Sequence, residues 1–186
     1  LLEWSDPQDA DGDGISGRAN IVWSLAEQRE VMGRFGWKAG QPDVRQQSAK
    51  AFAGDMGLTS NLVSSTDCTP RQKCETLPDG GEIEVDDNVM DNVAFYSRNL
   101  AVPTRRDIDD PTVRQGEQLF RKLECASCHR PRLTTPSGGV AGQLAEQTIW
   151  PYSDMLLHDM GEGLADGRRE FEASGQEWRT PPLWGI

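Results

Sequence analysis

Residues 119–133, Leu-Phe-Arg-Lys-Leu-Glu-Cys-Ala-Ser-Cys-His-Arg-Pro-Arg-Leu, decide how the rest of the chain is interpreted. Inside them, Cys125, Cys128 and His129 form a C-x-x-C-H motif. This spacing is typical of a covalently attached c-type haem, with two thioethers to the porphyrin and the imidazole on the iron. Residues three and four apart share one face of a helical turn, so a single turn can present all three side chains. The motif therefore predicts haem c, with His129 as an axial ligand of the iron.

Two other uses of a C-x-x-C pair were weighed against haem. A structural zinc site needs four ligands, and the other cysteines, Cys68 and Cys74, lie far away with no histidine beside them. A thiol–disulfide oxidoreductase would use Cys125 and Cys128 directly, but such enzymes place the pair near a βαβ pattern, which this sequence does not show. Haem attachment is favoured, and the thiol–disulfide oxidoreductase remains the alternative.

Composition narrows the class of protein. The 186 residues suffice for one large domain or two small ones, and the formal net charge is −11. Such acidity argues against binding to nucleic acid or to anionic membrane surfaces. No apolar run is long enough to span a bilayer, so no membrane insertion is expected. The first residues carry no signal-peptide pattern, as in a mature chain or a fragment.

The second cysteine pair indicates whether the protein works in an oxidising or a reducing compartment of the cell. Cys68 and Cys74 enclose a short polar loop, and such a close pair favours a disulfide in an oxidising environment. Attachment of haem to a C-x-x-C-H motif also takes place outside the cytoplasm. Both pairs therefore predict a periplasmic or otherwise extracytoplasmic protein.

An acidic stretch near the start of the chain resembles a calcium loop. Asp9, Asp11 and Asp13 alternate and a glycine follows, which matches the first six positions of an EF-hand-type loop. The Ile15 carbonyl would take the seventh position, and Asn20 stands at the twelfth, where Glu is usual. A calcium-binding structural module is therefore a candidate. The alternative is an Asp/Gly turn that satisfies its own backbone hydrogen bonds.

Apolar periodicity predicts helices over residues 42–57, 86–100 and 111–124, and a short helix is a candidate near 141–147. The expected core faces are Val44, Ser48, Ala51, Phe52 and Met56 in the first helix, Val89, Val93, Tyr96 and Leu100 in the second, and Val113, Leu119, Phe120 and Leu123 in the third. No segment shows the alternating pattern of a strand. We therefore expect a mainly α fold, a cytochrome c-like helical haem domain with long loops.

The sixth ligand of the iron is not obvious from the sequence. His158 is the only histidine besides His129, which makes it a candidate distal ligand, and Met155 and Met160 are rivals. A methionine ligand would raise the reduction potential relative to histidine. The alternative is that His158 is a hydrogen-bonding residue near the haem edge.

Six runs of sequence together resemble a known family. They are GRFGWKA (33–39), AFAGDMGLTS (51–60), YSRNLAVPTRRD (96–107), LFRKLECASCHRPRL (119–133), YSDMLLHDMGEGLADGR (152–168) and RTPPLWGI (179–186). In combination they resemble the di-haem oxidoreductases, relatives of bacterial di-haem cytochrome c peroxidases that are often called thiol oxidoreductases.

The resemblance implies two cytochrome c-like domains, each with its own C-x-x-C-H motif, whereas this chain has one. Residues 1–102 would be the C-terminal part of the first domain, and residues 103–186 the second domain without its C-terminal end. The first motif would lie before Leu1 and the native sixth ligand after Ile186. His158 or Met160 would then serve only as a substitute ligand.

The resemblance also implies catalytic residues. In the family a tryptophan carries electrons between the haems, and a glutamine ten residues later precedes an acid, usually Glu, beside the peroxide-binding haem. Trp37 and Gln47 have that spacing, and Asp55 stands two residues short of the expected acid. An acid there would act as general acid/base in breaking the O–O bond.

The implied function is that of a c-type haem electron-transfer domain of a di-haem peroxidase-like oxidoreductase. Electrons would come from an electron-donor protein or a small-molecule reductant and pass toward a peroxide-reducing haem. The fragment alone is not expected to be fully active.

Overall fold

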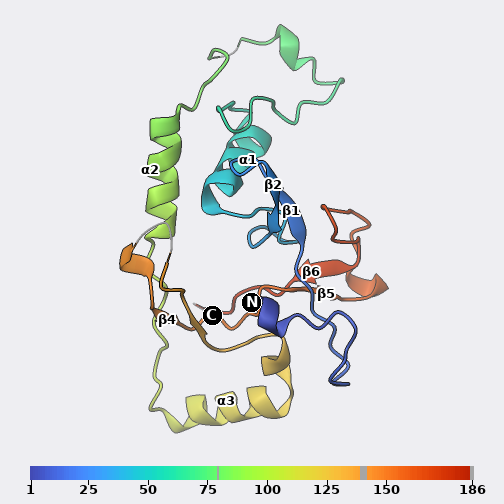
Figure 1. Cartoon of the computed structure of the whole chain (residues 1–186), viewed down its shortest axis with the longest axis vertical. Helices are drawn as coiled ribbons and strands as arrows, with labels where there is room; N and C mark the ends of the chain where they lie inside the picture. Colours follow the sequence, from blue (N-terminus) through green and yellow to red (C-terminus); the bar gives the residue numbers. More distant parts are fainter. Residues whose placement is uncertain (79, 139–141, 185–186) are drawn as a thin grey trace. The chain divides into compact units, whose positions relative to one another are not determined.

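The structure is a computed structural model that describes residues 1–78, 80–138 and 142–184 (Figure 1). Its described residues are 28% helical, counting short 3-10 turns, and 14% lie in strands or bridges. The expectation of a mainly α, cytochrome c-like fold is therefore wrong, and the chain is a small mixed α/β protein. The strands are only two to four residues long, too short for the alternation by which a sequence reveals strands.

The chain divides into two compact units. The first, called the motif unit below, contains Leu1–Asn20, Trp37–Ala39 and Ala101–Ile186. The second, called the hairpin unit, contains Ile21–Gly36 and Gly40–Leu100. The assignment of residues 1–102 and 103–186 to two related haem domains stays a prediction.

The elements of the hairpin unit are β1 (Ile21–Ser24), β2 (Arg29–Met32), α1 (Val44–Met56), the 3-10 turn η2 (Cys74–Thr76) and α2 (Asp87–Arg98). Strands β1 and β2 form an antiparallel hairpin, and α1 packs beside α2 (Figure 1). A disulfide joins Cys68 to Cys74 in the long loop between the two helices.

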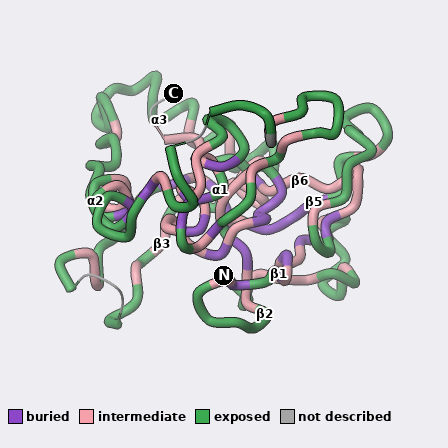
Figure 2. Tube along the Cα trace, turned by 90° about the horizontal axis from the view of Figure 1, so that it is seen from above, coloured by how far each residue is buried: buried purple, intermediate pink, exposed green. Residues whose placement is uncertain are grey.

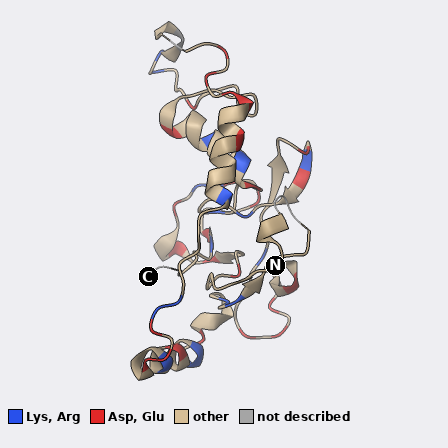
Figure 3. Ribbon diagram, turned by 90° about the vertical axis from the view of Figure 1, so that its left-hand side faces the viewer, with Lys and Arg blue, Asp and Glu red and all other residues tan. Residues whose placement is uncertain are grey.

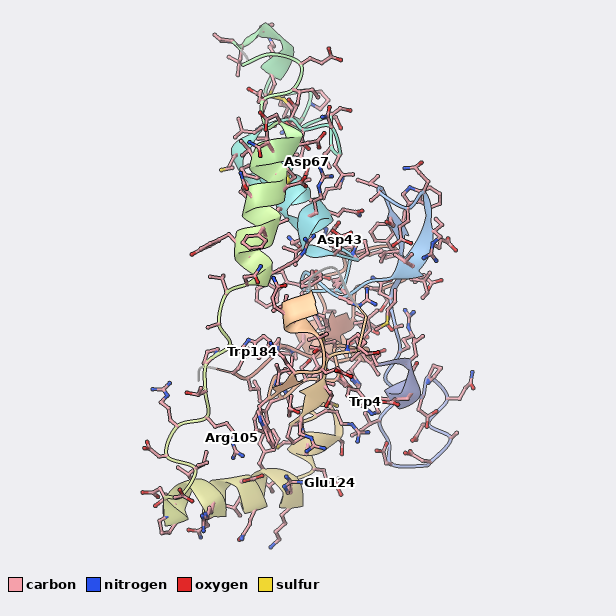
Figure 4. The ribbon with its side chains drawn as sticks, turned by 60° about the vertical axis from the view of Figure 1, so that its left-hand side comes forward. Trp4, Asp43, Asp67, Arg105, Glu124 and Trp184 are labelled. Atoms are coloured by element: carbon pink, nitrogen blue, oxygen red, sulfur yellow. A yellow bond between two sulfur atoms is a disulfide. The ribbon has the colours of Figure 1, made fainter. Side chains whose placement is uncertain are left out.

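Capping residues mark where both helices of this unit begin and where α1 ends. The Asp43 carboxylate accepts a hydrogen bond from the Gln46 amide at the start of α1 (Figure 4), and Gly57 ends that helix in the left-handed conformation. The Asp86 carboxylate caps α2 by accepting from the Val89 amide. The predicted helices over 42–57 and 86–100 are confirmed.

The predicted core faces of these helices are largely wrong, although Phe52 of α1 does pack against the core. Met90 and Ala94 are the buried residues of α2, whereas Val89, Tyr96 and Leu100 are exposed. In α1 the buried residues are Gln46, Ala49 and Ala53, and Met56 is exposed. Small alanines let two helices approach closely, so the contact forms along an alanine face and the larger apolar side chains turn outward. The core is a cluster of Ala49, Ala53, Val63, Val85 and Met90.

The elements of the motif unit are η1 (Leu2–Trp4), α3 (Pro111–Lys122), η3 (Cys125–Ser127), β3 (Leu133–Thr134), η4 (Gly142–Leu144), β4 (Thr148–Ile149), β5 (Leu157–Asp159), η5 (Glu162–Leu164) and β6 (Glu177–Arg179). Strand β3 pairs with β4, and β5 pairs with β6, both antiparallel. In the segment 141–147, where a short helix was a candidate, only a 3-10 turn is found, and residue 141 lies outside the described residues.

Helix α3 confirms the helix predicted over 111–124 but not its core face. Asp110 caps it, with Pro111 in its first turn. None of its described residues is buried, and Val113, Leu119 and Leu123 are exposed. Phe120 is the exception, because it is half-buried with its ring against those of His129 and Tyr152. Acidic and basic residues both lie along α3 (Figure 3). Periodicity identifies an apolar face but not the surface that covers it, and Val113, Leu119 and Leu123 stay exposed.

Strand β5 is the buried centre of the motif unit (Figure 2). Leu156 and Leu157 are inaccessible to solvent, and the backbone of Arg18 pairs with Leu157 on the side opposite β6. Ala39 and Ala173 pack against Leu157. None of the helices that the structure describes is long and apolar enough to cross a membrane.

Candidate functional site

The C-x-x-C-H motif follows directly from the end of α3. Glu124 (Figure 4) takes a left-handed conformation after the helix, with φ of 61°, and the chain then turns through η3. The His129 amide donates a hydrogen bond to the Cys125 carbonyl at 2.9 Å, which closes one helical turn. Cys125 and Cys128 are free, half-buried thiols. One turn therefore carries both sulfurs and the imidazole.

All three side chains of the motif line a single cavity of about 590 Å³. This volume lies within the range of small-molecule and cofactor sites. The other walls are largely apolar and aromatic, and include Trp37, Met160, Leu164, Trp178 and Pro181. A planar apolar group bonded to the two sulfurs would be in contact with these walls.

The His129 ring is held in one orientation. Its Nδ1 lies 2.8 Å from the Tyr152 carbonyl oxygen, which can only accept, so Nδ1 carries the proton and donates. The Nε2 lone pair is then free to bind a metal. Phe120 contacts the edges of the His129 and Tyr152 rings, with ring centroids 6.2 and 5.7 Å away. A metal-binding histidine commonly has this kind of carbonyl partner on its other nitrogen.

The residues after Pro151 hold the backbone of the motif. The Ser153 amide donates to the Arg130 carbonyl at 3.0 Å, and the Asp154 amide donates to the Cys128 carbonyl at 2.9 Å. The Ser153 hydroxyl in turn donates to the Thr180 carbonyl at 2.7 Å. The segment 152–154 thus links the motif on one side to Thr180, directly after β6, on the other.

His158 lies on β5 with both ring nitrogens engaged. Its Nε2 is 2.8 Å from the Asp154 carboxylate, and its Nδ1 is 3.8 Å from the Cys128 sulfur. Burial favours the neutral ring, but the hydrogen bond to Asp154, followed by that to Cys128, outweighs it and raises the pKa of His158 to about 9. His158 is therefore a charged partner of Asp154 near neutral pH. Met160, another candidate distal ligand, also lines the cavity.

Two tryptophans line the cavity, and they differ in their surroundings. The indole of Trp178 donates to the Leu164 carbonyl at 2.9 Å, and the Lys38 ammonium lies 4.2 Å from its ring centre. Trp37 is 77% exposed, with its carbonyl accepting from the Arg179 amide.

A second hollow, of about 610 Å³, lies beside the same aromatic residues. Phe120, Tyr152, Trp150 and Trp184 line it, together with Arg105 (Figure 4). The Arg105 guanidinium lies over the Trp150 ring at 5.3 Å and pairs with a carboxylate of α3. No cysteine or histidine stands among its described lining residues, so this hollow has no group with which to attach a haem.

Gln47 and Asp55 belong to the hairpin unit, on helix α1. The Gln47 Oε1 atom is buried and has no hydrogen-bond partner in the described part of the chain. Asp55 is exposed at the rim of a shallow apolar hollow of about 240 Å³, with Phe52 and Val93. Trp37 belongs to the motif unit, so its position relative to these two residues stays a prediction.

The predicted calcium loop brings three of its five residues together. Carboxylate oxygens of Asp9, Asp11 and Asp13 all lie within 4.8 Å of one another, and each carboxylate also accepts from a backbone amide of the loop. Asn20 is engaged elsewhere: its buried amide donates to the carbonyls of Lys38 and Glu170 and accepts from a backbone amide. The role of the Ile15 carbonyl stays a prediction.

Tyr152, Asp154 and Trp178 were not predicted from the sequence. Each acts through a contact with a residue distant in the sequence, and no local motif marks it. The four-residue spacing of Asp154 and His158 was visible, but spacing gives a contact only once the backbone between the two residues is known.

Comparison with known proteins gives a family. The family model described as "Di-haem oxidoreductase, putative peroxidase" matches residues 1–186. No match was found among curated proteins or among solved structures.

Proposed function

Since this chain belongs to the di-haem oxidoreductase family, we propose that its motif unit binds haem c, through thioethers at Cys125 and Cys128 and through His129 on the iron. Haem binding and an oxidoreductase function follow from the family. The covalent attachment is our own proposal. The observation that carries it is the His129–Tyr152 hydrogen bond, which leaves Nε2 as a metal ligand in a cavity also lined by two free thiols.

The residues present fit this group. The cavity has a suitable volume, apolar and aromatic walls, and both sulfurs on one turn with the imidazole. When bound, the haem supplies one-electron iron redox chemistry, tuned by the axial ligand and by hydrogen bonding around it. Tyr152 tunes it from the protein side, because its carbonyl accepts a hydrogen bond from Nδ1–H and makes the imidazole a stronger electron donor to the iron.

We propose that Trp37 carries electrons between this haem and a peroxide-reducing haem. Its indole lines the cavity and is largely exposed, so one part of the ring faces the haem site and another remains open to a redox partner. The donor would be an electron-donor protein or a small-molecule reductant. Reduction of one peroxide molecule to two waters consumes two electrons and two protons.

Gln47 and Asp55 are proposed to act at the peroxide-reducing centre. A buried amide oxygen without a partner is costly, by roughly 1–3 kcal/mol, and such atoms concentrate where a ligand supplies the missing hydrogen bond. The Gln47 oxygen can accept a hydrogen bond from a peroxide O–H group. Asp55 would carry the proton between the two peroxide oxygens.

An extracytoplasmic location is proposed on the basis of the sulfur chemistry. The Cys68–Cys74 disulfide needs an oxidising compartment to persist, and thioether attachment of haem is completed in the same compartment. Fractionation of the native host would test this: recovery of the protein in the cytoplasmic fraction with four reduced cysteines would refute it.

Calcium binding by Asp9, Asp11 and Asp13 remains a second proposal. The convergence of three carboxylates supports it, since hard oxygen ligands are those that Ca²⁺ prefers. Calorimetric titration with calcium tests it, and absence of any binding heat at millimolar calcium would refute it.

The decisive experiment for the main proposal is production with and without haem-attachment machinery. With the machinery, we expect haem that survives denaturing electrophoresis and a pyridine haemochrome spectrum of the c type. Cys125→Ser combined with Cys128→Ser should abolish covalent haem, whereas Cys68→Ser combined with Cys74→Ser, the matched control, should retain it. A haem-free wild-type chain that exchanges disulfides would instead support the thiol–disulfide oxidoreductase.

A further inference from the structure

The two cysteines of the motif are held differently. The Cys128 sulfur lies 3.8 Å from His158 Nδ1, on a strand 30 residues away in sequence. The Cys125 sulfur has its contact at 3.9 Å with the Leu123 carbonyl of its own turn. One thiol is therefore oriented by a distant element of the fold, and the other by its local backbone.

The imidazole that contacts Cys128 is fixed on its far side. Asp154 is buried, and one carboxylate oxygen accepts from His158 Nε2 at 2.8 Å while the other accepts from the Leu156 amide at 2.9 Å. A carboxylate only accepts, so Nε2 carries a proton and Nδ1 is the atom that faces the sulfur. The ring thus has one defined orientation toward Cys128.

Gly17 prevents the ring from retreating. A Cβ atom at this buried position would lie 2.8 Å from His158 Cε1, closer than such atoms approach in proteins, and 3.2 Å from both His158 Nε2 and Leu156 Cδ1. The imidazole is therefore packed directly against the Gly17 backbone, and its side chain is only 10% exposed. Cys128, His158, Asp154 and Gly17 form one contact chain inside the motif unit.

We infer that His158, held by Asp154 and Gly17, is a positioning residue that orients the Cys128 sulfur for thioether formation with a haem vinyl group. The inference rests on the proposed function. It assigns to His158 a role in maturation of the site, distinct from that of an iron ligand.

The reaction that His158 assists is a redox-neutral addition. The Cys128 thiol adds across a vinyl double bond of the haem: a sulfur–carbon bond forms, the carbon–carbon π bond and the S–H bond break, and the hydrogen ends on the second vinyl carbon. The haem is the one co-reactant. Such additions depend on holding the attacking atom close to its target, and misplacement by about 1 Å costs about 100-fold.

Two variants of His158 separate its two contacts. The amide of His158→Asn stands where Nδ1 stands and keeps a polar group beside Cys128, whereas the longer His158→Gln reaches Asp154 and leaves the sulfur without a partner. Each is produced with haem-attachment machinery, and thioethers at Cys125 and Cys128 are counted by peptide mass spectrometry. We expect His158→Gln to lose the Cys128 thioether about tenfold more than the Cys125 thioether, and His158→Asn to retain both.

Two further variants control for folding. Gly17→Ala adds a methyl group that pushes the His158 ring without removing a polar group. It should lower the yield of the Cys128 thioether in the same way, but less than His158→Gln does. Asp159→Asn changes an exposed carboxylate on the same strand and should behave like wild type. Unequal loss at the two cysteines in Gly17→Ala would support the inference even if the His158 variants misfold.

Some results would overturn the inference. One is the formation of both thioethers in His158→Gln. Another is an equal loss of the Cys125 and Cys128 thioethers in both His158→Gln and Gly17→Ala, which would indicate general structural damage. Wild type without any covalent haem would instead refute the proposed function itself, and with it this inference. The two failures are distinguished by the wild-type spectrum alone.

Discussion

Replacement of Asp154 by Asn tests the buried charge pair at the centre of the motif unit. Asn keeps the acceptor for the Leu156 amide, but it places an amide group opposite the protonated Nε2 of His158. Two donors then face each other in a buried site. The change is nearly isosteric, so the cost comes from the lost charge and hydrogen bond, not from a cavity.

The expected cost follows from the titration of His158. Its pKa rises from 6.5 to about 9 in the folded chain, and each tenfold change in protonation equilibrium is worth about 1.4 kcal/mol. The difference corresponds to about 3 kcal/mol. Cys128 contributes part of the shift and is unaffected by the substitution. We therefore expect Asp154→Asn to lower the free energy of unfolding by about 2–3 kcal/mol, near the range for breaking a buried ion pair.

The sign of the pH dependence is fixed by the raised pKa. Stability from the pair is fully present below pH 6.5, where His158 is protonated in both the folded and the unfolded chain, and is lost as the pH rises through about 9. The difference between wild type and Asp154→Asn should therefore be largest near pH 6 and small near pH 10.

The assay is urea denaturation of the reduced, haem-free chain, followed by the fluorescence of its six tryptophans. Asp159→Asn is the matched control and should leave the free energy of unfolding unchanged within about 0.5 kcal/mol. The assigned charge pair would be refuted if wild type and Asp154→Asn had the same free energy of unfolding at pH 6. It would also be refuted if their difference in free energy were equal at pH 6 and pH 10.

Three further outcomes are expected. Trp37→Phe should lower the kcat of peroxide reduction by about tenfold or more with KM unchanged, and an unchanged kcat would exclude Trp37 from electron transfer. Cys68→Ser combined with Cys74→Ser should lower the free energy of unfolding by about 2 kcal/mol, as expected for a seven-residue loop, measured by urea denaturation against the oxidised wild type. Asp11→Asn should weaken calcium binding about tenfold in calorimetry, and equal affinity would show that the carboxylate cluster is not the site.

The positions of the helices could be predicted from the sequence because their signals are local. Asp86 and Asp110 each stand just before a run of helical periodicity, and they cap α2 and α3. Most of the core faces were predicted wrongly because burial depends on what packs against a helix. In α2 the small Ala94 and the flexible Met90 fit against α1, while the larger Tyr96 is excluded.

The same distinction explains what the sequence revealed of the site. Cys125, Cys128 and His129 lie within five residues, and their spacing suffices to predict one turn. The residues that hold them, Tyr152 and Asp154, meet the motif only through tertiary hydrogen bonds. No rule of spacing connects positions more than 20 residues apart, so these supporting residues could be found only in the fold.

The fold also separates the two candidates for a substitute distal ligand. His158 could bind iron through Nε2 only by giving up its hydrogen bond to Asp154, at a cost close to that of the charge pair, about 3 kcal/mol. Binding through Nδ1 would require the ring to leave the Cys128 sulfur. Met160 lines the same cavity, and its side chain is half exposed. We therefore expect Met160 to be the substitute ligand where one binds.

That expectation separates the two residues experimentally. Met160→Leu should lower the reduction potential and leave both thioethers intact, because a methionine ligand raises the potential relative to its absence or to histidine. His158→Asn should leave the potential nearly unchanged. A changed potential in His158→Asn, with no change in Met160→Leu, would show that the iron draws His158 away from Asp154 in spite of the cost.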